Sequence, residues 1–242
     1  MQTCISGIGL TKTYGSVCAL RDVTISVGSG EVFGLLGANG AGKTTTIECL
    51  LGVTAPDSGA VELFGMEPRA NRKRVFERVG VQFQEVRYQD KIKVDELCRE
   101  TRALYTQPAD YVGLLEEFGL ADKRDDFVEA LSGGQKQRLF IVLALVSSPD
   151  AVFLDELTTG LDVRARRDVW TYLDQLKKAG LTIVLTSHSM EEVERLCDRI
   201  AILGQGRIVF EGSVSDAVLS GGFKTLEEAY LAYAEGGSDE SL

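Results

Sequence analysis

The segment from Gly37 to Thr44, Gly-Ala-Asn-Gly-Ala-Gly-Lys-Thr, places the tightest constraint on how this chain folds. It matches the pattern G-x-x-x-x-G-K-[ST] in full. Glycines let the backbone bend so that successive N–H groups face phosphate oxygens, and the N-terminus of a following helix favours the same anion. Apolar residues over 31–36 predict a strand before the segment, and residues 43–51 predict a helix after it. The sequence therefore predicts a phosphate-binding loop between a strand and a helix.

Each part of this loop has an expected role in holding a nucleotide. We expect Lys43 to reach the β- and γ-phosphates and the Thr44 hydroxyl to ligate Mg²⁺. A chance match is the alternative, and the predicted strand and helix on either side argue against it. The residues predicted to bind nucleotide here are Gly37, Ala38, Asn39, Gly40, Ala41, Gly42, Lys43, Thr44 and Thr45.

Two carboxylates follow a second apolar run. Residues 151–154, Ala-Val-Phe-Leu, predict a strand buried on both faces, and Asp155 and Glu156 come directly after it. Side chains at the carboxyl end of a parallel strand face the ligand crevice of such a sheet. Asp155 suits Mg²⁺, and Glu156 is placed to polarise a water for attack on the γ-phosphate. Carboxylates often simply end strands, so this reading depends on the loop upstream.

The order of the predicted elements indicates an α/β protein. Strands alternate with helices, which favours a parallel sheet, and the mostly helical pattern over 85–146 indicates an inserted helical subdomain. We expect one domain over 1–242. Its core and β subdomain cover about 1–84 and 150–235, its helical subdomain about 85–149, and a polar tail 236–242.

Composition excludes several classes of protein. With 44% hydrophobic residues in 242, the chain can bury a full core, so we exclude disorder and a small disulfide scaffold. The longest apolar run, Leu139 to Val146, is far below the ~20 residues that span a bilayer, and no signal peptide is visible. The net charge of −10 disfavours nucleic acid. Five dispersed cysteines without a C-x-x-C pair indicate reduced thiols.

One further segment is specific to a known family. Residues 131–138, Leu-Ser-Gly-Gly-Gln-Lys-Gln-Arg, together with the loop and the acidic strand end, resemble the nucleotide-binding subunits of ATP-binding-cassette (ABC) proteins. Ser132 is suited to cap a helix whose bare N–H groups form a second anion site. The resemblance implies that Ser132, Gly133, Gly134 and Gln135 bind the ATP held by an opposite copy, so that two chains sandwich two nucleotides head to tail. A surface helix with a glycine-rich start is the alternative.

The same resemblance assigns further residues. Tyr14 is expected to stack on adenine, with a buried strand tyrosine as the alternative. Gln84, favoured over Gln82 because it directly precedes the helical block, is expected to touch Mg²⁺ and the attacking water. His188, the only histidine, is expected to contact the γ-phosphate, although a lone histidine is more often structural.

Two features of the loop after Glu156 also come from the resemblance. Residues 159–162, Thr-Gly-Leu-Asp, resemble the family's loop that crosses to the partner subunit. Leu157 stands where the family usually has proline, which would fix φ. We expect this difference to affect the rigidity of the loop and not the chemistry, because no catalytic atom comes from that side chain.

The implied function is an active Mg²⁺-dependent ATPase with ATP and Mg²⁺ as cofactors. The catalytic residues expected are Lys43, Gln84, Glu156 and His188, and the metal ligands Thr44, Gln84 and Asp155. The resemblance implies a P-loop core with a RecA-like parallel sheet, an N-terminal antiparallel β subdomain and an inserted helical subdomain.

We expect this ATPase to power transport from the cytoplasmic face of a membrane. Its partner would be a separate permease docking near Glu85 to Asp95, with no nucleic-acid partner. The sequence most resembles the export-type ATPases of multidrug and antibiotic-resistance systems. An importer ATPase, a soluble ABC ATPase that remodels a complex, and a nucleotide sensor without turnover are the alternatives. A single cassette and the lack of long coiled coils argue against translation and repair factors.

Overall fold

The computed structural model describes residues 2–83, 88–156, 158 and 161–236. The chain forms two compact units, one from Met1–Val75 with Val184–Leu242 and the other from Phe76–Ile183. The chain leaves the first unit within helix α2 (Arg72–Phe76) and returns to it within strand β7 (Thr182–Thr186).

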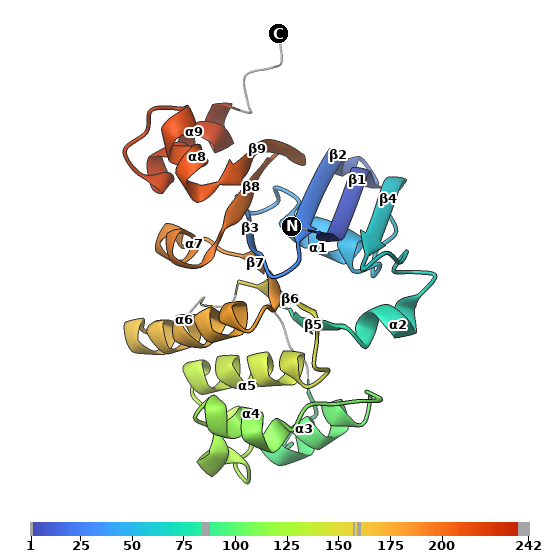
Figure 1. Cartoon of the computed structure of the whole chain (residues 1–242), viewed down its shortest axis with the longest axis vertical. Helices are drawn as coiled ribbons and strands as arrows, with labels where there is room; N and C mark the ends of the chain where they lie inside the picture. The colour runs from blue at the N-terminus through green and yellow to red at the C-terminus, as the bar shows by residue number, and fades with distance from the viewer. Residues whose placement is uncertain (1, 84–87, 157, 159–160, 237–242) are drawn as a thin grey trace. The chain divides into compact units, whose positions relative to one another are not determined.

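An antiparallel sheet in the order β2-β1-β4 forms one part of the first unit, and Figure 1 shows its strands side by side. Alternate residues of the second strand, Val23, Ile25 and Val27, are buried, as the period of two in a half-buried strand requires. The first two strands form one long antiparallel hairpin. The strands are β1 (Thr3–Tyr14), β2 (Val17–Gly28) and β4 (Ser58–Leu63).

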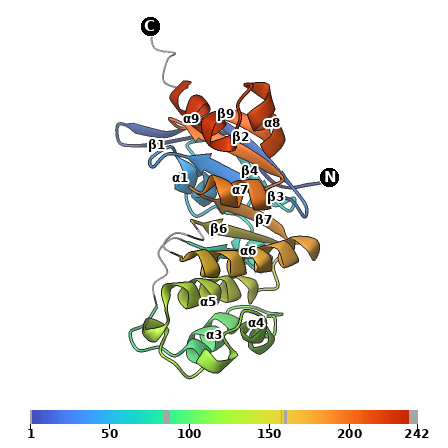
Figure 2. The same cartoon turned by 90° about the vertical axis from the view of Figure 1, so that its left-hand side faces the viewer.

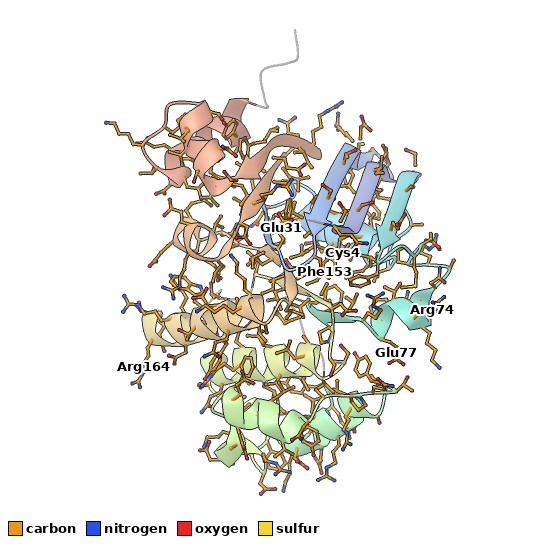
Figure 3. All side chains as sticks on the ribbon, viewed as in Figure 1. Cys4, Glu31, Arg74, Glu77, Phe153 and Arg164 are labelled. Carbon is orange, nitrogen blue, oxygen red and sulfur yellow. The ribbon has the colours of Figure 1, made fainter. Side chains whose placement is uncertain are left out.

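A second set of strands in this unit is mixed. β3 (Val32–Gly37) is buried throughout and pairs in parallel with β8 (Arg199–Gly204), while β9 (Arg207–Ser213) pairs with β8 in the antiparallel direction. Glu31 before β3, labelled in Figure 3, is buried and pairs with Arg199 at 3.1 Å. The predicted parallel sheet is present, and β9 adds an antiparallel edge.

Besides α2, the described residues of the first unit form four helices. The helices that follow the second set of strands pack on it, and Figure 2 shows α8 and α9 beside β9. A cluster of fully buried residues joins them: Leu36, Val193, Ile200, Ile202, Ala217 and Leu226. The four helices are α1 (Lys43–Leu50), α7 (Met190–Leu196), α8 (Val214–Ser220) and α9 (Leu226–Gly236).

A parallel strand pair and several helices make up most of what the structure describes of the second unit. β5 (Val79–Gln82) pairs with β6 (Ala151–Asp155), whose Phe153, labelled in Figure 3, is buried. Within the described residues 88–146 of the predicted helical region lie three α-helices and two 3₁₀ turns, at Ala121–Lys123 and Val128–Ala130. The helices are α3 (Val94–Arg102), α4 (Tyr111–Glu117), α5 (Gly133–Leu145) and, after β6, α6 (Val163–Lys178).

A buried carboxylate organises the helical part of this unit. Asp95, 5% exposed, accepts hydrogen bonds from the guanidinium groups of Arg124 and Arg99 and from the Tyr111 hydroxyl. The Arg124 bond, with help from Arg99 and Tyr111, lowers the pKa of Asp95 to about 2 against the opposing effect of its burial. The side chain thus joins α3, α4 and the 3₁₀ segment around residue 124.

The observed elements confirm the predicted α/β class with its antiparallel β part. The helices α2 and α7 were not among the predicted elements, because five and seven residues give little periodicity to detect. The domain bounds near 85 and 149 stay a prediction. Among the helices that the structure describes, none combines the length and apolar character needed to cross a bilayer.

Candidate nucleotide site

The backbone of the predicted phosphate loop requires glycine at its two ends. Gly37 has φ 153° and Gly42 has φ 109°, both in the region that disfavours side chains. A Cβ at Gly37 would lie 2.7 Å from the carbonyl oxygen of Leu203, and one at Gly42 would lie 2.6 Å from that of Ala19. The loop therefore packs directly against the backbone of two neighbouring strands.

Lys43 begins α1 and turns its ammonium back over the loop. Its Nζ donates hydrogen bonds to the carbonyl oxygens of Gly37 at 2.7 Å and Ala38 at 3.2 Å, and the residue is 7% exposed. Gly42 precedes the helix without a side-chain cap, while Thr46 closes the first turn by donating to the Gly42 carbonyl. A positive charge and an uncapped helix N-terminus thus lie in the same loop, which suits a polyanion.

The β8–β9 turn supports the loop from one flank. The Gly206 N–H donates to the Ala41 carbonyl at 3.0 Å, and the Gly206 carbonyl accepts from the Arg21 N–H at 2.7 Å. The sequence gives no sign of this contact, because the Gly-Gln-Gly pattern at 204–206 is typical of a turn and does not indicate which loop the turn meets. A cavity of about 180 Å³ lies between loop and turn, lined by Ala38, Asn39, Gly40, Ala41, Leu203, Gly204, Gln205 and Ala234.

Tyr14 ends β1 in the same unit and remains 47% exposed. The alternative of a buried strand tyrosine is therefore wrong. The Lys12 ammonium lies 5.4 Å from the centre of the Tyr14 ring, within the range of a cation–π contact. The ring is half open to an approaching group and already contacts a cation.

His188 also belongs to the first unit, in the connection between β7 and α7. The side chain is exposed, and the next residue, Ser189, caps α7 by accepting from the Glu192 N–H at 3.4 Å. Ser187 in turn accepts from the Ser189 N–H at 3.0 Å. Two serines thus fix the backbone on either side of the histidine.

The acidic strand end lies in the second unit. Every residue of β6 is buried, including Asp155 at 6% exposure. Glu156 follows with φ 50°, a left-handed conformation that is uncommon for residues other than glycine. Such strained conformations cluster at functional sites. Asp162 caps α6 through a 2.9 Å bond from the Ala165 N–H, whereas Leu157, Thr159 and Gly160 lie outside the described residues.

Ser132 caps α5, as its sequence context predicted. Its hydroxyl accepts from the Gln135 N–H at 3.3 Å, and the Gln135 side-chain oxygen accepts from the Ser132 N–H at 2.9 Å. Ser132 and Gly133 are exposed. A Cβ at Gly134 would lie 2.9 Å from that of Ala165, so α5 and α6 pack closely there.

Of the two glutamines at the end of β5 and just beyond it, the structure describes only Gln82. Gln84 lies outside the described residues, so its predicted role stays a prediction. Gln82 is 4% exposed and donates through Nε2 to the Phe83 carbonyl at 2.8 Å. Its Oε1 is a buried atom without a hydrogen-bond partner in the described part of the chain.

The residues present fit a magnesium ion bound together with a nucleotide. No group of three His, Cys, Asp or Glu side chains that could hold a metal occurs among the described residues. Mg²⁺ in nucleotide sites does not need such a group, because it takes one or two carboxylates, waters and phosphate oxygens. The exposed Thr44 hydroxyl and the Asp155 carboxylate are donors of this kind.

Comparisons with known proteins place these features in a family. The ABC transporter family model matches residues 20–159. The Nod factor export ATP-binding protein I of Paraburkholderia xenovorans is 43% identical over 222 residues, which cover 86% of this chain and 70% of that protein. The protein of the same name from Ralstonia nicotianae is 40% identical over 215 residues, which cover 87% of this chain and 67% of that protein.

Solved structures agree on the fold. A solved ATP-binding subunit of an ABC transporter matches with a TM-score of 0.87 at 28% identity, over 96% of this chain and 99% of that one. A dimeric bacterial ABC transporter cassette matches with a TM-score of 0.77 at 23% identity, over 87% of this chain and 98% of that one. Because the matched family region contains the phosphate loop, the capped start of α5 and the acidic strand end, this chain belongs to the ABC transporter family, as an ATPase subunit of a transporter.

Proposed function

We propose that this subunit binds ATP with Mg²⁺ and that its hydrolysis powers export through a separate membrane protein. The observation that carries the proposal is the phosphate loop, where the buried Lys43 ammonium and the uncapped start of α1 present positive charge to a polyanion. Export follows the relatives at about 40% identity, which are export ATP-binding proteins.

Nucleotide binding divides between an aromatic ring and the loop. In this proposal Tyr14 stacks on the adenine, which its exposed ring permits. The backbone N–H groups of Gly37–Thr45 hold the phosphates, and Lys43 exchanges its bonds to the loop carbonyls for the β- and γ-phosphate oxygens.

Hydrolysis requires a base for the attacking water. In our proposal Glu156 accepts the proton of that water. Its left-handed backbone conformation at the end of β6 restricts the direction in which the side chain leaves the strand. Lys43 stabilises the charge that develops on the transferred phosphoryl group. His188 and Gln84 orient the γ-phosphate and the water.

The magnesium ion would be held by Thr44, Asp155 and Gln84 together with phosphate oxygens. When bound, Mg²⁺ neutralises charge on the β- and γ-phosphates. Thr44 and Asp155 contribute oxygen donors, and the burial of Asp155 restricts where its carboxylate can lie.

A second copy of the chain completes each site in this proposal. The start of α5, with Ser132, Gly133, Gly134 and Gln135, binds the γ-phosphate of ATP held by the partner, as a second helix N-terminus suited to an anion. The permease docks near Glu85 to Asp95. The subunit is then peripheral, on the cytoplasmic face of the membrane.

Replacing the proposed base tests this mechanism. Glu156→Gln removes a proton acceptor while keeping the shape of the side chain, so we expect phosphate release to fall about 10²- to 10⁴-fold. ATP affinity should remain close to that of the natural protein. Because the nucleotide is bound and not consumed, gel filtration with ATP should detect a dimer that persists.

Lys43→Ala is the matched control, because it removes a phosphate-binding ammonium and leaves the general base Glu156 in place. We expect this variant to lose ATP binding and to stay monomeric in the same experiment. Wild-type phosphate release by Glu156→Gln, measured with the membrane partner present, would exclude Glu156 as the base. Export would be excluded if the subunit and its membrane partner, reconstituted in vesicles, hydrolysed ATP while transport across the vesicle membrane stayed the same with and without ATP.

A further inference from the structure

A short-range ion pair joins the end of β1 to the turn before β4. The Lys12 Nζ lies 2.9 Å from the Asp57 carboxylate. The other carboxylate oxygen accepts from the Thr13 N–H at 2.7 Å, and the Asp57 N–H donates to the Thr11 carbonyl at 2.7 Å. Asp57 thus bonds to three consecutive residues, 11–13, immediately before Tyr14.

The same lysine contacts the tyrosine ring. Residues 12 and 14 of a strand point to the same face, which explains why the Lys12 Nζ lies 5.4 Å from the centre of the Tyr14 ring. The pairing of β1 with β2 is irregular between Leu10 and Thr13. Irregular pairing of this kind re-aims side chains and is frequent beside functional sites.

The ion pair restricts the Lys12 side chain beside the ring. The Lys12 side chain is 15% exposed, while Asp57 is 46% exposed. The Asp57 carboxylate bonds to the ammonium directly, which restricts the positions that the Lys12 side chain can take. Tyr14 itself keeps about half of its surface open.

We infer that Lys12 and Asp57 position the Tyr14 ring for the base and so set the base-dependent part of nucleotide affinity. The inference rests on the proposed stacking of Tyr14 on adenine. Lys12 and Asp57 are positioning residues, since they act through Tyr14. A cation over one part of the ring restricts its rotamers before the nucleotide arrives, which lowers the entropy lost on stacking.

Two ligands separate this role from a general effect on the fold. We would measure the affinity of the full chain for ATP and for inorganic tripolyphosphate, which has no base. Lys12→Met keeps the length of the side chain and removes its charge. We expect ATP to bind about two- to fivefold more weakly, as loss of a cation–π contact predicts, and tripolyphosphate to bind as before. Asp57→Asn should shift the ATP affinity in the same direction.

Two further variants complete the design. Tyr14→Ala should weaken ATP binding about five- to a hundredfold without changing tripolyphosphate affinity. In that background Lys12→Met should cause no further loss, because the ring through which it acts is gone. Lys123→Met removes another lysine paired with carboxylates, Asp122 and Asp126, and should leave both affinities unchanged.

The outcomes distinguish the inference from the proposed function. Unchanged ATP affinity in Tyr14→Ala would remove the adenine role on which the inference depends. Three other outcomes would overturn the positioning role alone. ATP affinity could fall in Tyr14→Ala but not in Lys12→Met, or Lys12→Met could weaken tripolyphosphate binding as much as ATP binding. The losses of ATP affinity could also add in the double variant. Melting temperatures of all variants show whether any change arises from unfolding.

Discussion

Among the helices that the structure describes, α1 and α5 both begin at a glycine-rich segment, and the two N-termini are capped differently. The start of α1 has Gly42 at its cap position with φ 109° and no side-chain cap. The start of α5 has Ser132 there, and Ser132 and Gln135 bond reciprocally to each other's backbone. One start is left without a capping side chain, and the other supplies its own.

The difference separates two ways of using a helix N-terminus. The first N–H groups of a helix need partners from outside it. At α1 the chain provides a lysine and a bent loop instead of a cap, so the best partner is an anion. At α5 the cap stabilises the helix without any ligand, and only Gly133 and Gly134 precede the bonded Gln135 N–H. The first start therefore leaves more N–H groups for a ligand than the second, whose cap already satisfies the Gln135 N–H.

The largest effect expected from this comparison is that of Gly42→Ala. A Cβ there would lie 2.6 Å from the Ala19 carbonyl oxygen, on a backbone with φ 109°. The loop must move to relieve this contact, so we expect ATP affinity to fall at least about a hundredfold. Titration with a fluorescent ATP analogue measures the loss.

Gly180→Ala is the control for backbone strain alone. Gly180 has φ 89°, and a Cβ there would have no heavy atom within 4 Å. Strain without a collision should lower the melting temperature and leave ATP affinity unchanged. Equal ATP affinity in Gly42→Ala and the natural protein would show that the uncapped start needs no glycine.

Acid provides the next largest effect and acts on the unit that contains α5. The pKa of Asp95 is lowered to about 2, chiefly by the bond from Arg124, from an ordinary value of 3.8. A carboxyl with a depressed folded-state pKa contributes stability above its unfolded pKa, and that contribution is lost as the pH falls from about 4 toward 2. Hydrogen exchange of α3 and α4 should therefore accelerate over this range before that of β1 and β2.

Asp95→Asn tests the assignment of this acid response. It leaves the guanidinium groups of Arg99 and Arg124 without their carboxylate, which should cost stability at neutral pH by about 1–3 kcal/mol. The variant should also lose the pH dependence between 4 and 2 in the α3 and α4 segments. An unchanged pH profile would assign the acid response to other carboxylates.

The two helix starts also show what a sequence can predict. The strand, loop and helix around Gly37–Lys43 were predictable because the motif is local and every part is in one stretch of chain. The cap at Ser132 was predictable for the same reason. The support of the loop by Gly206 and the ion pair of Lys12 with Asp57 were not, since each joins segments that lie far apart in the sequence. Helix α7 had a local signal that was missed, Ser189 with Glu192 three residues later.

Ser132→Ala has a smaller expected effect on the isolated chain. Loss of the cap should lower the free energy of unfolding by about 1 kcal/mol, or the melting temperature by about 2–4 °C. ATP affinity at concentrations where the chain is monomeric should not change, because the proposed role of Ser132 is in the partner's site. Steady-state turnover should fall about tenfold, as loss of a hydrogen bond to a charged group predicts. A loss of monomeric ATP affinity would contradict the division between the two starts.

The smallest stability change expected is that of Gly133→Ala, and its sign makes it informative. Gly133 lies in the first turn of α5, and a Cβ there would have no heavy atom within 4 Å. Alanine is the better helix former, so the variant should be more stable by up to about 1 kcal/mol. The packing of the described residues therefore does not explain a glycine at this position. If the α5 start approaches ATP on a second copy, the added methyl group should slow turnover while the melting temperature rises. A rise in melting temperature with full turnover would mean that no ligand comes close to this helix, and the second start would be structural only.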